Sequence, residues 1–534
     1  MNNEKICLIY PPLSVNEFPH LALPTLKSYL TSNGFPNTVI QDFNVTIMDR
    51  YIRGGFSKIE KYFNDHGMNT DRDKLLKDYD HAREILREKE CGRDGRAMTL
   101  INTYLRIAGS NIFDVCFLPE TLSKLEQGIE NYDINEDNMI MKYIKDEVMP
   151  YFQENPAKII GITIPFTSQI YYAFIIGKEL KKRYPDVNIV MGGPQISMFG
   201  HIFAKHEGFR SSFDGMLRGL GEISLIKYVD CVLNGGDLHR VPSLLYYDEN
   251  EMLSINEEVE KAPVDTLLLP DFSDLPLERY VYPKIPYQMA RGCYWGRCAF
   301  CSYKEVKDYD ARPTEVILDE LEKLKSIYNI RMFHFIDDAL KPDKIKDFAE
   351  QVIARNMDIT YEAYLRLDRG FTPDICTLLK KSGLKSVLFG FESANQRVLN
   401  LMNKGNTPKI TKQVLYNMKQ AGIQNVLSCL IGFPSESREE AWESINFLAK
   451  NKELYDQVFI VKFGMISDMY KQKEKYKIAW INMEDLVRYD DTGFIAIGYP
   501  FDTTEGMKEQ EAFEVIREGR EKLEISIFPD NFFV

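Results

Sequence analysis

Short apolar runs alternate with helical patterns along most of this 534-residue sequence. The first run, Lys5–Pro12, ends at a double proline, as a buried strand does where it enters a loop. An apolar stripe at Leu23, Leu26 and Leu30 follows, and Gly34 closes it, which is the spacing and the ending of a helix. Repetition of this order predicts an α/β fold that begins with a doubly wound, Rossmann-like parallel sheet.

The first domain is expected to cover residues 1–235. Its further strands are expected at residues 37–45, 157–166, 188–194 and 213–222, with helices at residues 171–183 and 223–233. From about residue 48 to 155 the alternation is interrupted by charged sequence with helical spacing. This stretch predicts a helical insertion whose charged faces are solvated.

A second domain is expected after a connector at residues 236–285, where hairpin-like runs and proline turns prevail. In residues 286–469 six strands alternate with helices; we expect them at residues 287–293, 331–338, 359–368, 386–393, 425–434 and 456–465. Six such units predict a partial (β/α)6 barrel, which carries its reactive groups at the carboxyl ends of the strands. Residues 470–534 form a small C-terminal region in this interpretation.

Charge and composition narrow the classes of function. The formal net charge is −13, so the average field repels nucleic acid, and no nucleic-acid partner is expected. The sequence contains no apolar run long enough to span a bilayer and no secretion signal, which predicts a cytoplasmic protein without a membrane span. Its nine cysteines are an odd number and mostly scattered, which favours reduced thiols over a disulfide framework.

Three of these cysteines, Cys293, Cys298 and Cys301, form a C-x4-C-x2-C cluster near the first strand of the expected barrel. Zinc and iron–sulfur sites both fit such thiols, and a purely structural site normally takes four protein ligands. A remote cysteine could complete a zinc site. Three ligands alone would leave one metal position open to bind a substrate, as catalytic metals require.

The cysteine cluster resembles the cluster loop of the radical SAM superfamily, in which an open iron chelates S-adenosylmethionine (SAM). The commonest spacing there is C-x3-C-x2-C with an aromatic residue before the last cysteine; this sequence has Phe300 there and one extra residue in the first gap. The resemblance implies a 4Fe-4S cluster held by the three cysteines, bound SAM, and an external electron donor such as flavodoxin or ferredoxin.

Later motifs extend this resemblance along the expected barrel. They are "FIDDAL" after the second strand, "GFES" at the fourth, "GFP" at the fifth and an arginine at the end of the third. The SAM-binding residues implied are Phe300, Asp337, Asp338, Arg366, Gly390, Glu392, Ser393, Gly432, Phe433 and Pro434, with Arg366 a candidate for the SAM carboxylate. Asp337 could equally cap a helix, and Gly390 and Gly432 could serve backbone packing.

The first domain resembles the cobalamin-binding domain of cobalamin-dependent radical SAM enzymes. Glycines after two of its strands allow the backbone to approach a bulky ligand at the crevice where such sheets bind. The cobalamin-binding residues implied are Thr163, Thr167, Ser168, Gly192, Gly193, Gly219, Gly221 and Glu222. A nucleotide-binding sheet is the alternative, but the G-x-G-x-x-G fingerprint is absent after the first strand.

The Asp-x-His-x-x-Gly motif of proteins that ligate cobalt with histidine is absent as well. We therefore expect no histidine below the corrin, and we expect His20, in the first loop, to lie on the surface.

The family's commonest chemistry implies methylation of an unactivated carbon of a small-molecule or peptide substrate, through a 5′-deoxyadenosyl radical and methylcobalamin. A radical rearrangement, cyclisation or ring contraction without methyl transfer is the first alternative. Sulfur insertion into transfer RNA is disfavoured by the acidic balance. A non-enzymatic, zinc-bearing binding protein is the alternative from another class.

Overall fold

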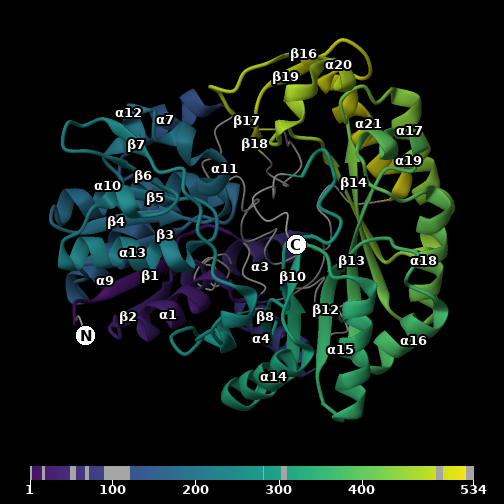
Figure 1. The fold of residues 1–534 in the computed structure, drawn as a ribbon, viewed down its shortest axis with the longest axis horizontal. Coiled ribbons are helices and arrows are strands. Elements are labelled where there is room, and N and C mark those ends of the chain that lie inside the picture. The colour runs from purple at the N-terminus through teal and green to yellow at the C-terminus, as the bar shows by residue number, and fades with distance from the viewer. Residues whose placement is uncertain are drawn as a thin grey trace. The chain divides into compact units, whose positions relative to one another are not determined.

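The computed structural model describes residues 3–14, 18–47, 56–65, 71–88, 121–136, 138–280, 282–301, 309–488 and 497–524. Two compact units make up the fold, which Figure 1 shows as a ribbon. The first unit ends at Tyr282 and the second begins at Pro283.

The first unit is built on a seven-stranded sheet with the order β2-β1-β3-β4-β5-β6-β7. The strands are β1 (Ile6–Tyr10), β2 (Thr38–Asp42), β3 (Ile159–Thr163), β4 (Asn188–Gly192), β5 (Gly215–Leu217), β6 (Leu244–Tyr247) and β7 (Leu253–Ile255). β1 to β5 pair in parallel, in the order 2-1-3-4-5 of a doubly wound sheet. The predicted Rossmann-like parallel sheet is therefore confirmed.

The hairpin expected to act as a connector joins this sheet. β6 pairs with β5, and β7 with β6, both antiparallel. An antiparallel hairpin can extend the edge of a parallel sheet because it needs only a short turn between its strands. The first sheet therefore has two more strands, β6 and β7, than the sequence predicted.

Helices lie between the strands of the first unit. They are α1 (Ala22–Ser32), α3 (Phe56–Asp65), α4 (Arg72–Glu88), α7 (Leu122–Glu130), α8 (Met139–Tyr143), α9 (Met149–Glu154), α10 (Ile170–Arg183), α11 (Pro194–Phe203), α12 (Glu207–Arg210) and α13 (Gly221–Asn234). α3, α4, α7, α8 and α9 fall in the expected helical insertion, of which residues 48–55, 66–70, 89–120 and 137 lie outside the described residues. The first half of α10, residues 170–177, is apolar and buried on every side, whereas its last turn is basic.

The second unit contains six parallel strands in sequential order. They are β8 (Lys284–Tyr287), β11 (Met332–Phe335), β12 (Thr360–Leu365), β13 (Leu384–Glu392), β14 (Gln424–Ile431) and β15 (Gln457–Lys462). Each pairs only with its neighbours in the chain among these strands, so β8 and β15 are the edges of the described sheet. This sheet is the predicted partial barrel. Its first strand, β8, ends at Tyr287, whereas the sequence predicted the first strand at residues 287–293.

One face of the barrel sheet is covered by helices, and the other carries polar groups. The helices are α14 (Thr314–Tyr328), α15 (Pro342–Ala354), α16 (Pro373–Lys381), α17 (Gln396–Leu401), α18 (Pro408–Gln420) and α19 (Arg438–Lys450). Tyr361 packs against Phe348 of α15, with ring centroids 5.4 Å apart, whereas Glu362 and Tyr364 point to the other, partly exposed face. This alternation is what a strand with one buried face requires.

The C-terminal region completes the barrel. It contains α20 (Lys473–Tyr476), α21 (Glu509–Leu523) and two short strand pairs, β16 (Ile478–Ile481) with β19 (Phe501–Thr503) and β17 (Val487–Arg488) with β18 (Ile497–Gly498). α21 packs on α19, where a Cβ on Gly519 would lie 2.7 Å from Ile445 Cδ1, and Arg520 donates a 2.6 Å hydrogen bond to the carbonyl of Ile460 in β15. α21 therefore acts as the helix that covers the last strand.

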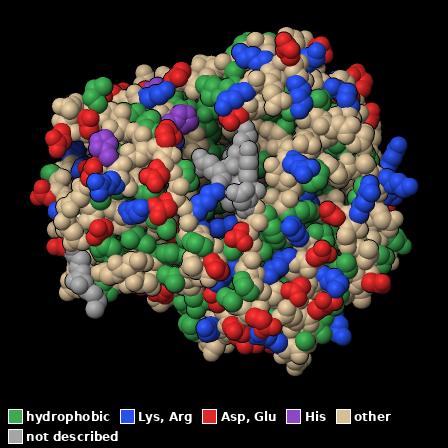
Figure 2. Space-filling model, viewed as in Figure 1, with side chains coloured by type: hydrophobic (Ala, Val, Ile, Leu, Met, Phe, Trp, Pro, Cys, Tyr) green, Lys and Arg blue, Asp and Glu red, His purple; other side chains and the backbone are tan. Residues whose placement is uncertain are grey.

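Two further properties are the distribution of charged side chains on the surface and the apolar character of the helices. On the face shown in Figure 2, basic and acidic side chains are interspersed over both units. Among the described residues, no helix combines the length and the apolar character needed to cross a membrane.

Candidate functional site

The three clustered cysteines lie in one loop beyond the carboxyl end of β8. The short strand β9 (Ala290–Arg291) precedes this loop and pairs with β10 (Asp310–Ala311). Cys293 forms a single parallel bridge with Ala339, which ties the loop to the end of β11. None of the three cysteines is disulfide-bonded, and each is partly exposed. Three thiols on one loop, at the end of a barrel where reactive groups gather, are a donor set that fits an iron–sulfur cluster.

Within the described ranges, no three His, Cys, Asp or Glu side chains converge on the position of a single metal ion.

A second segment, Met402–Gly405, holds the cysteine loop. The indole of Trp295 donates a 2.7 Å hydrogen bond to the carbonyl of Asn403, and the backbone N–H of Ala299 donates to the carbonyl of Met402 at 2.9 Å. Gly405 lies directly against the Trp295 ring, where a Cβ would overlap it. These contacts fix the loop between its first and last cysteines to a part of the chain about 100 residues away in sequence.

Arg366 joins the same two segments. Its Nη1 donates to Cys298 Sγ at 3.7 Å, and its Nη2 donates to the carbonyl of Lys404. The guanidinium also lies 4.7 Å from the centre of the Trp295 ring. The arginine expected to bind the SAM carboxylate is therefore in contact with a cluster cysteine.

Asp337, after β11, is almost fully buried at 1% exposure. Its Oδ1 accepts hydrogen bonds from the N–H groups of Met289, at 2.9 Å, and Ala290, at 2.6 Å. Burial raises the pKa of Asp337 to about 7, although these two N–H groups partly offset the effect. Since α15 begins with Lys341 as its N-cap, the helix-cap alternative for Asp337 is wrong; Asp337 supports the turn that leads into the cysteine loop.

Asp338 is exposed beside it.

Glu392 ends β13 at a bulge and adopts a left-handed backbone conformation, with φ of 61°. Its carboxylate forms a 2.8 Å ion pair with Lys404, and its Oε2 accepts from Ser428 at 3.4 Å. Gly390 leaves the space for this pair. The next residue, Ser393, is fully buried, and its hydroxyl is hydrogen-bonded to Ser444 of α19 at 3.0 Å. Glu392 thus belongs to the end of the barrel, while Ser393 is directed to the helix behind it.

The turn at Gly432 follows β14. Gly432 has φ of 81°, and its N–H donates to Glu436 Oε2 at 2.7 Å, as does that of Phe433 at 3.2 Å. Burial raises the pKa of Glu436 to about 8, partly offset by these two donors. Its Oε1 has no hydrogen-bond partner among the described residues.

Phe433 is buried against Phe463, with ring centroids 5.2 Å apart, and Pro434 is buried as well.

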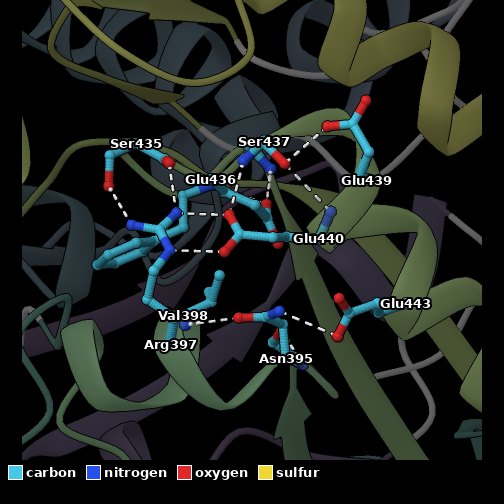
Figure 3. Close-up of polar contacts among 12 residues, drawn as sticks. Asn395, Arg397, Val398, Ser435, Glu436, Ser437, Glu439, Glu440 and Glu443 are labelled. Carbon is cyan, nitrogen blue, oxygen red and sulfur yellow. Dashed lines mark hydrogen bonds and ion pairs between the residues drawn. The ribbon is translucent and has the colours of Figure 1, made fainter.

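Arg397 fixes the far side of this turn, as Figure 3 shows. From α17 its guanidinium donates to the carbonyl of Ser435 at 2.6 Å and forms an ion pair with Glu440 of α19. Ser437 caps α19 in a capping box with Glu440. The turn is therefore held from two helices, which is what a rigid binding edge needs.

A polar network on the partly exposed face of the barrel was missed by the sequence analysis. Glu362 Oε2 accepts from Lys284 at 2.8 Å and lies 3.0 Å from His334 Nδ1, while His334 Nε2 lies 3.0 Å from the hydroxyl of Tyr364. Burial alone would raise the pKa of Glu362, but Lys284 and His334 outweigh it and hold that pKa below its ordinary range. The alternating polar residues of "TYEAYLR" were the signal.

In the first unit, the expected cobalamin residues gather at the carboxyl edge of β3, β4 and β5. Thr163 and Gly192 are register partners at the ends of β3 and β4. Gly193 has φ of 94°, and a Cβ there would lie 2.9 Å from Thr163 Oγ1. Ser197 links the two glycine turns, since it accepts from the N–H of Gly219 at 2.8 Å and donates to the carbonyl of Gly193 at 3.1 Å.

The remaining candidates flank this edge. They lie in the 3-10 turn after β3 and at the start of α13, and they are Thr167, Ser168, Gly221 and Glu222.

His20 is not a surface residue, contrary to expectation. It is partly buried, with its ring centroid 5.6 Å from that of Tyr10. Its Nδ1 accepts a 3.3 Å hydrogen bond from the N–H of Ala22. Burial lowers the pKa of His20 to about 4, so the ring is neutral. With Nδ1 as the acceptor, the proton of the neutral ring is on Nε2.

Comparison with known proteins supports this interpretation of the barrel. Residues 287–448 match the model of the radical SAM superfamily. An uncharacterised methyltransferase of Pyrococcus horikoshii is 29% identical over 299 residues, which are 55% of this chain and 64% of that protein. An anaerobic magnesium-protoporphyrin IX monomethyl ester cyclase of Rubrivivax gelatinosus is 26% identical over 58% of this chain and 57% of its own length. The chain thus spans less than two thirds of these relatives.

Two solved structures share the fold over most of the chain. The cobalamin-dependent SAM radical enzyme OxsB, with aqua-cobalamin bound, matches 89% of this chain and 56% of its own, with a TM-score of 0.58 and 16% identity. The radical SAM methyltransferase TsrM of Kitasatospora setae, with cobalamin and a [4Fe-4S] cluster bound, matches 86% of this chain and 75% of its own, with a TM-score of 0.54 and 16% identity.

None of these matches supports the zinc-bearing binding protein. The superfamily match implies a 4Fe-4S cluster and SAM for the domain that holds the three cysteines. The chain carries a radical SAM domain and has the fold of the cobalamin-dependent radical SAM enzymes.

Proposed function

We propose that this protein is a cobalamin-dependent radical SAM enzyme that methylates an unactivated carbon of a small-molecule or peptide substrate. The observation that carries the proposal is the combination of a radical SAM domain with a preceding doubly wound sheet, in a fold shared with two cobalamin-binding enzymes. The methyltransferase named among the relatives supports methyl transfer as the outcome.

Cys293, Cys298 and Cys301 would hold the cluster. SAM would bind across the carboxyl ends of the barrel strands, with Asp338, Glu392 and the backbone turn at Gly432 as candidate contacts. When bound, the cluster and SAM supply a 5′-deoxyadenosyl radical, and cobalamin carries a methyl group. The protein's own contribution is to orient these groups and to exclude water; the rigid turn at Gly432 and the clamp at Met402–Gly405 serve the first purpose.

Cobalamin would bind at the carboxyl edge of the first sheet, against the turns at Gly193 and Gly219. We propose that no histidine of this unit ligates cobalt. The absence of an Asp-x-His-x-x-Gly motif from the sequence supports this proposal.

Ring formation without methyl transfer is the second candidate, because cyclases are among the relatives. The two outcomes differ in the products of SAM. Methylation consumes one SAM as methyl donor and another as radical source, so S-adenosylhomocysteine would appear together with 5′-deoxyadenosine. 5′-Deoxyadenosine alone would support the cyclase-type reaction and contradict methyl transfer.

The first test concerns the cofactors. After anaerobic purification and reconstitution with iron and sulfide, we expect about four irons per chain and retention of added hydroxocobalamin. Cys298→Ala should lose the iron and keep the corrin, whereas Cys231→Ala, which removes a partly exposed cysteine of the first unit, should keep both. Zinc without iron would overturn the proposal. Iron without retained corrin would show a radical SAM enzyme that does not bind cobalamin.

The second test concerns the electron supply. A reduced flavodoxin or ferredoxin should replace dithionite in forming 5′-deoxyadenosine from SAM. Its failure to do so with an intact cluster would contradict the expected class of electron donor.

A further inference from the structure

Arg366 is a buried cation whose contacts all involve the cysteine loop or the segment that clamps it. Its residue is 9% exposed, and it follows directly after β12. Among the described residues, no carboxylate lies within ion-pair distance of its guanidinium. Tyr294, whose ring centre lies 5.9 Å away, links it to the nearby Asp368, because the Tyr294 hydroxyl donates a 3.0 Å hydrogen bond to that carboxylate. The neighbouring cation, Lys404, is neutralised by Glu392.

A buried positive charge without a counter-ion is costly unless an anion completes the site. The atom that can supply this anion is Cys298 Sγ, 3.7 Å from Nη1. A cysteine becomes a thiolate when it binds iron, and the hydrogen bond then becomes charge-assisted. Cation–π contact with Trp295 at 4.7 Å and the bond to the Lys404 carbonyl fix the guanidinium plane in this position.

Reduction of the cluster adds one electron and makes the cluster one charge more negative, with no bond made or broken. A fixed positive charge and a hydrogen bond to a ligating sulfur both stabilise the reduced form more than the oxidised form. They therefore raise the reduction potential of the cluster.

We propose that Arg366 is a positioning residue that acts through Cys298: it raises the reduction potential of the cluster, and it does not bind the carboxylate of SAM. The inference rests on the proposed function in one respect, that the three cysteines hold the cluster.

The experiment measures the midpoint potential of the cluster in the full chain, with dithionite as the reductant and electron paramagnetic resonance of the reduced cluster as the signal, in the absence of SAM, cobalamin and substrate. In Arg366→Gln the ratio of reduced to oxidised cluster at a fixed potential should fall about tenfold, which corresponds to a shift of about 59 mV for one electron. Arg366→Lys keeps the charge but loses the planar fork, so a smaller fall is expected.

Arg369→Gln is the matched control, because Arg369 is an exposed arginine in the same loop; its potential should equal that of the wild type. An unchanged potential in Arg366→Gln together with weaker SAM binding would overturn the inference and restore the carboxylate role. If neither Arg366 variant holds iron, Arg366 builds the loop and the inference is also overturned. A wild-type chain that holds no cluster would overturn the proposed function itself, before any variant is compared.

Discussion

Lys404 and Glu392 form an ion pair of 2.8 Å in which each side chain is only 8% exposed. Glu392 reaches it from a strained left-handed backbone at the end of β13, and Lys404 from the segment that clamps the cysteine loop. The pair therefore connects the fourth barrel strand to the loop that would carry the cluster. Breaking such a buried pair from one side leaves an uncompensated charge and costs about 3–5 kcal/mol.

Gly390→Ala tests the space under this ion pair. A Cβ at position 390 would overlap Glu392 Oε1 and lie 2.6 Å from Lys404 Nζ, so the pair must shift. We expect a loss of about 1–3 kcal/mol in the free energy of unfolding, measured with urea, and weaker SAM binding. Gly192→Ala is the control, since its nearest new contact is 3.6 Å away. Equal stability of the two variants would contradict the prediction.

Gly405→Ala tests the clamp on the cysteine loop. Its Cβ would overlap the Trp295 ring, so the ring must leave its place against the loop. We expect a lower iron content after reconstitution. Gly422→Ala is matched in φ, at 76° against 78°, but its Cβ meets only the flexible end of Lys380, at 3.7 Å or more. It should keep the iron content of the wild type, and a similar loss in both variants would assign the effect to backbone strain alone.

Glu436→Gln should change how stability depends on pH. Burial raises the pKa of Glu436 from 4.5 to about 8, so the folded protein holds a proton that the unfolded chain releases between these values. The contribution of Glu436 to stability should therefore fall as the pH rises from about 5 to about 8. Glutamine resembles the protonated acid and cannot ionise, so the urea midpoint of the variant should fall less over this range.

Glu439→Gln is the matched control for this pH series, because Glu439 is an exposed carboxylate in the first turn of α19 whose lowered pKa keeps it ionised in the folded protein over this range. Its profile should run parallel to that of the wild type. A parallel profile for Glu436→Gln as well would show that Glu436 is already ionised in the folded protein.

Much of the architecture could be predicted because it follows from local patterns. Buried parallel strands appear in a sequence as short apolar runs, and the helices that flank them as apolar residues with a period of about 3.6 positions. Five of the six barrel strands lie where these patterns place them. The first does not: Pro286 reads as a strand breaker, and "YQMARGC" alternates like a strand. Proline is tolerated in β8 because β8 is an edge strand of the described sheet.

The partners of the site residues could not be predicted in the same way. Arg366, Trp295 and Lys404 meet through loops that are far apart in sequence, and spacing along the chain carries no information about such contacts. The resemblance gave Arg366 a ligand role, whereas the geometry places it on Cys298. The network of Glu362, His334 and Tyr364 could have been predicted, because polar residues that alternate along a strand indicate a face that is not packed in the core.

Gly193→Ala tests the edge of the first sheet, where cobalamin is proposed to bind. Gly193 and Gly34 both have a positive φ, 94° and 95°, which L side chains rarely adopt, so alanine adds backbone strain at either position. At Gly34 a Cβ meets nothing within 4 Å, whereas at Gly193 it would press on Ile164 N and Thr163 Oγ1, both 2.9 Å away. Gly193→Ala should therefore unfold at a lower urea concentration than Gly34→Ala and retain less corrin after gel filtration, while Gly34→Ala retains as much as the wild type. Equal corrin retention in both variants, with Gly193→Ala still folded, would place cobalamin away from this turn.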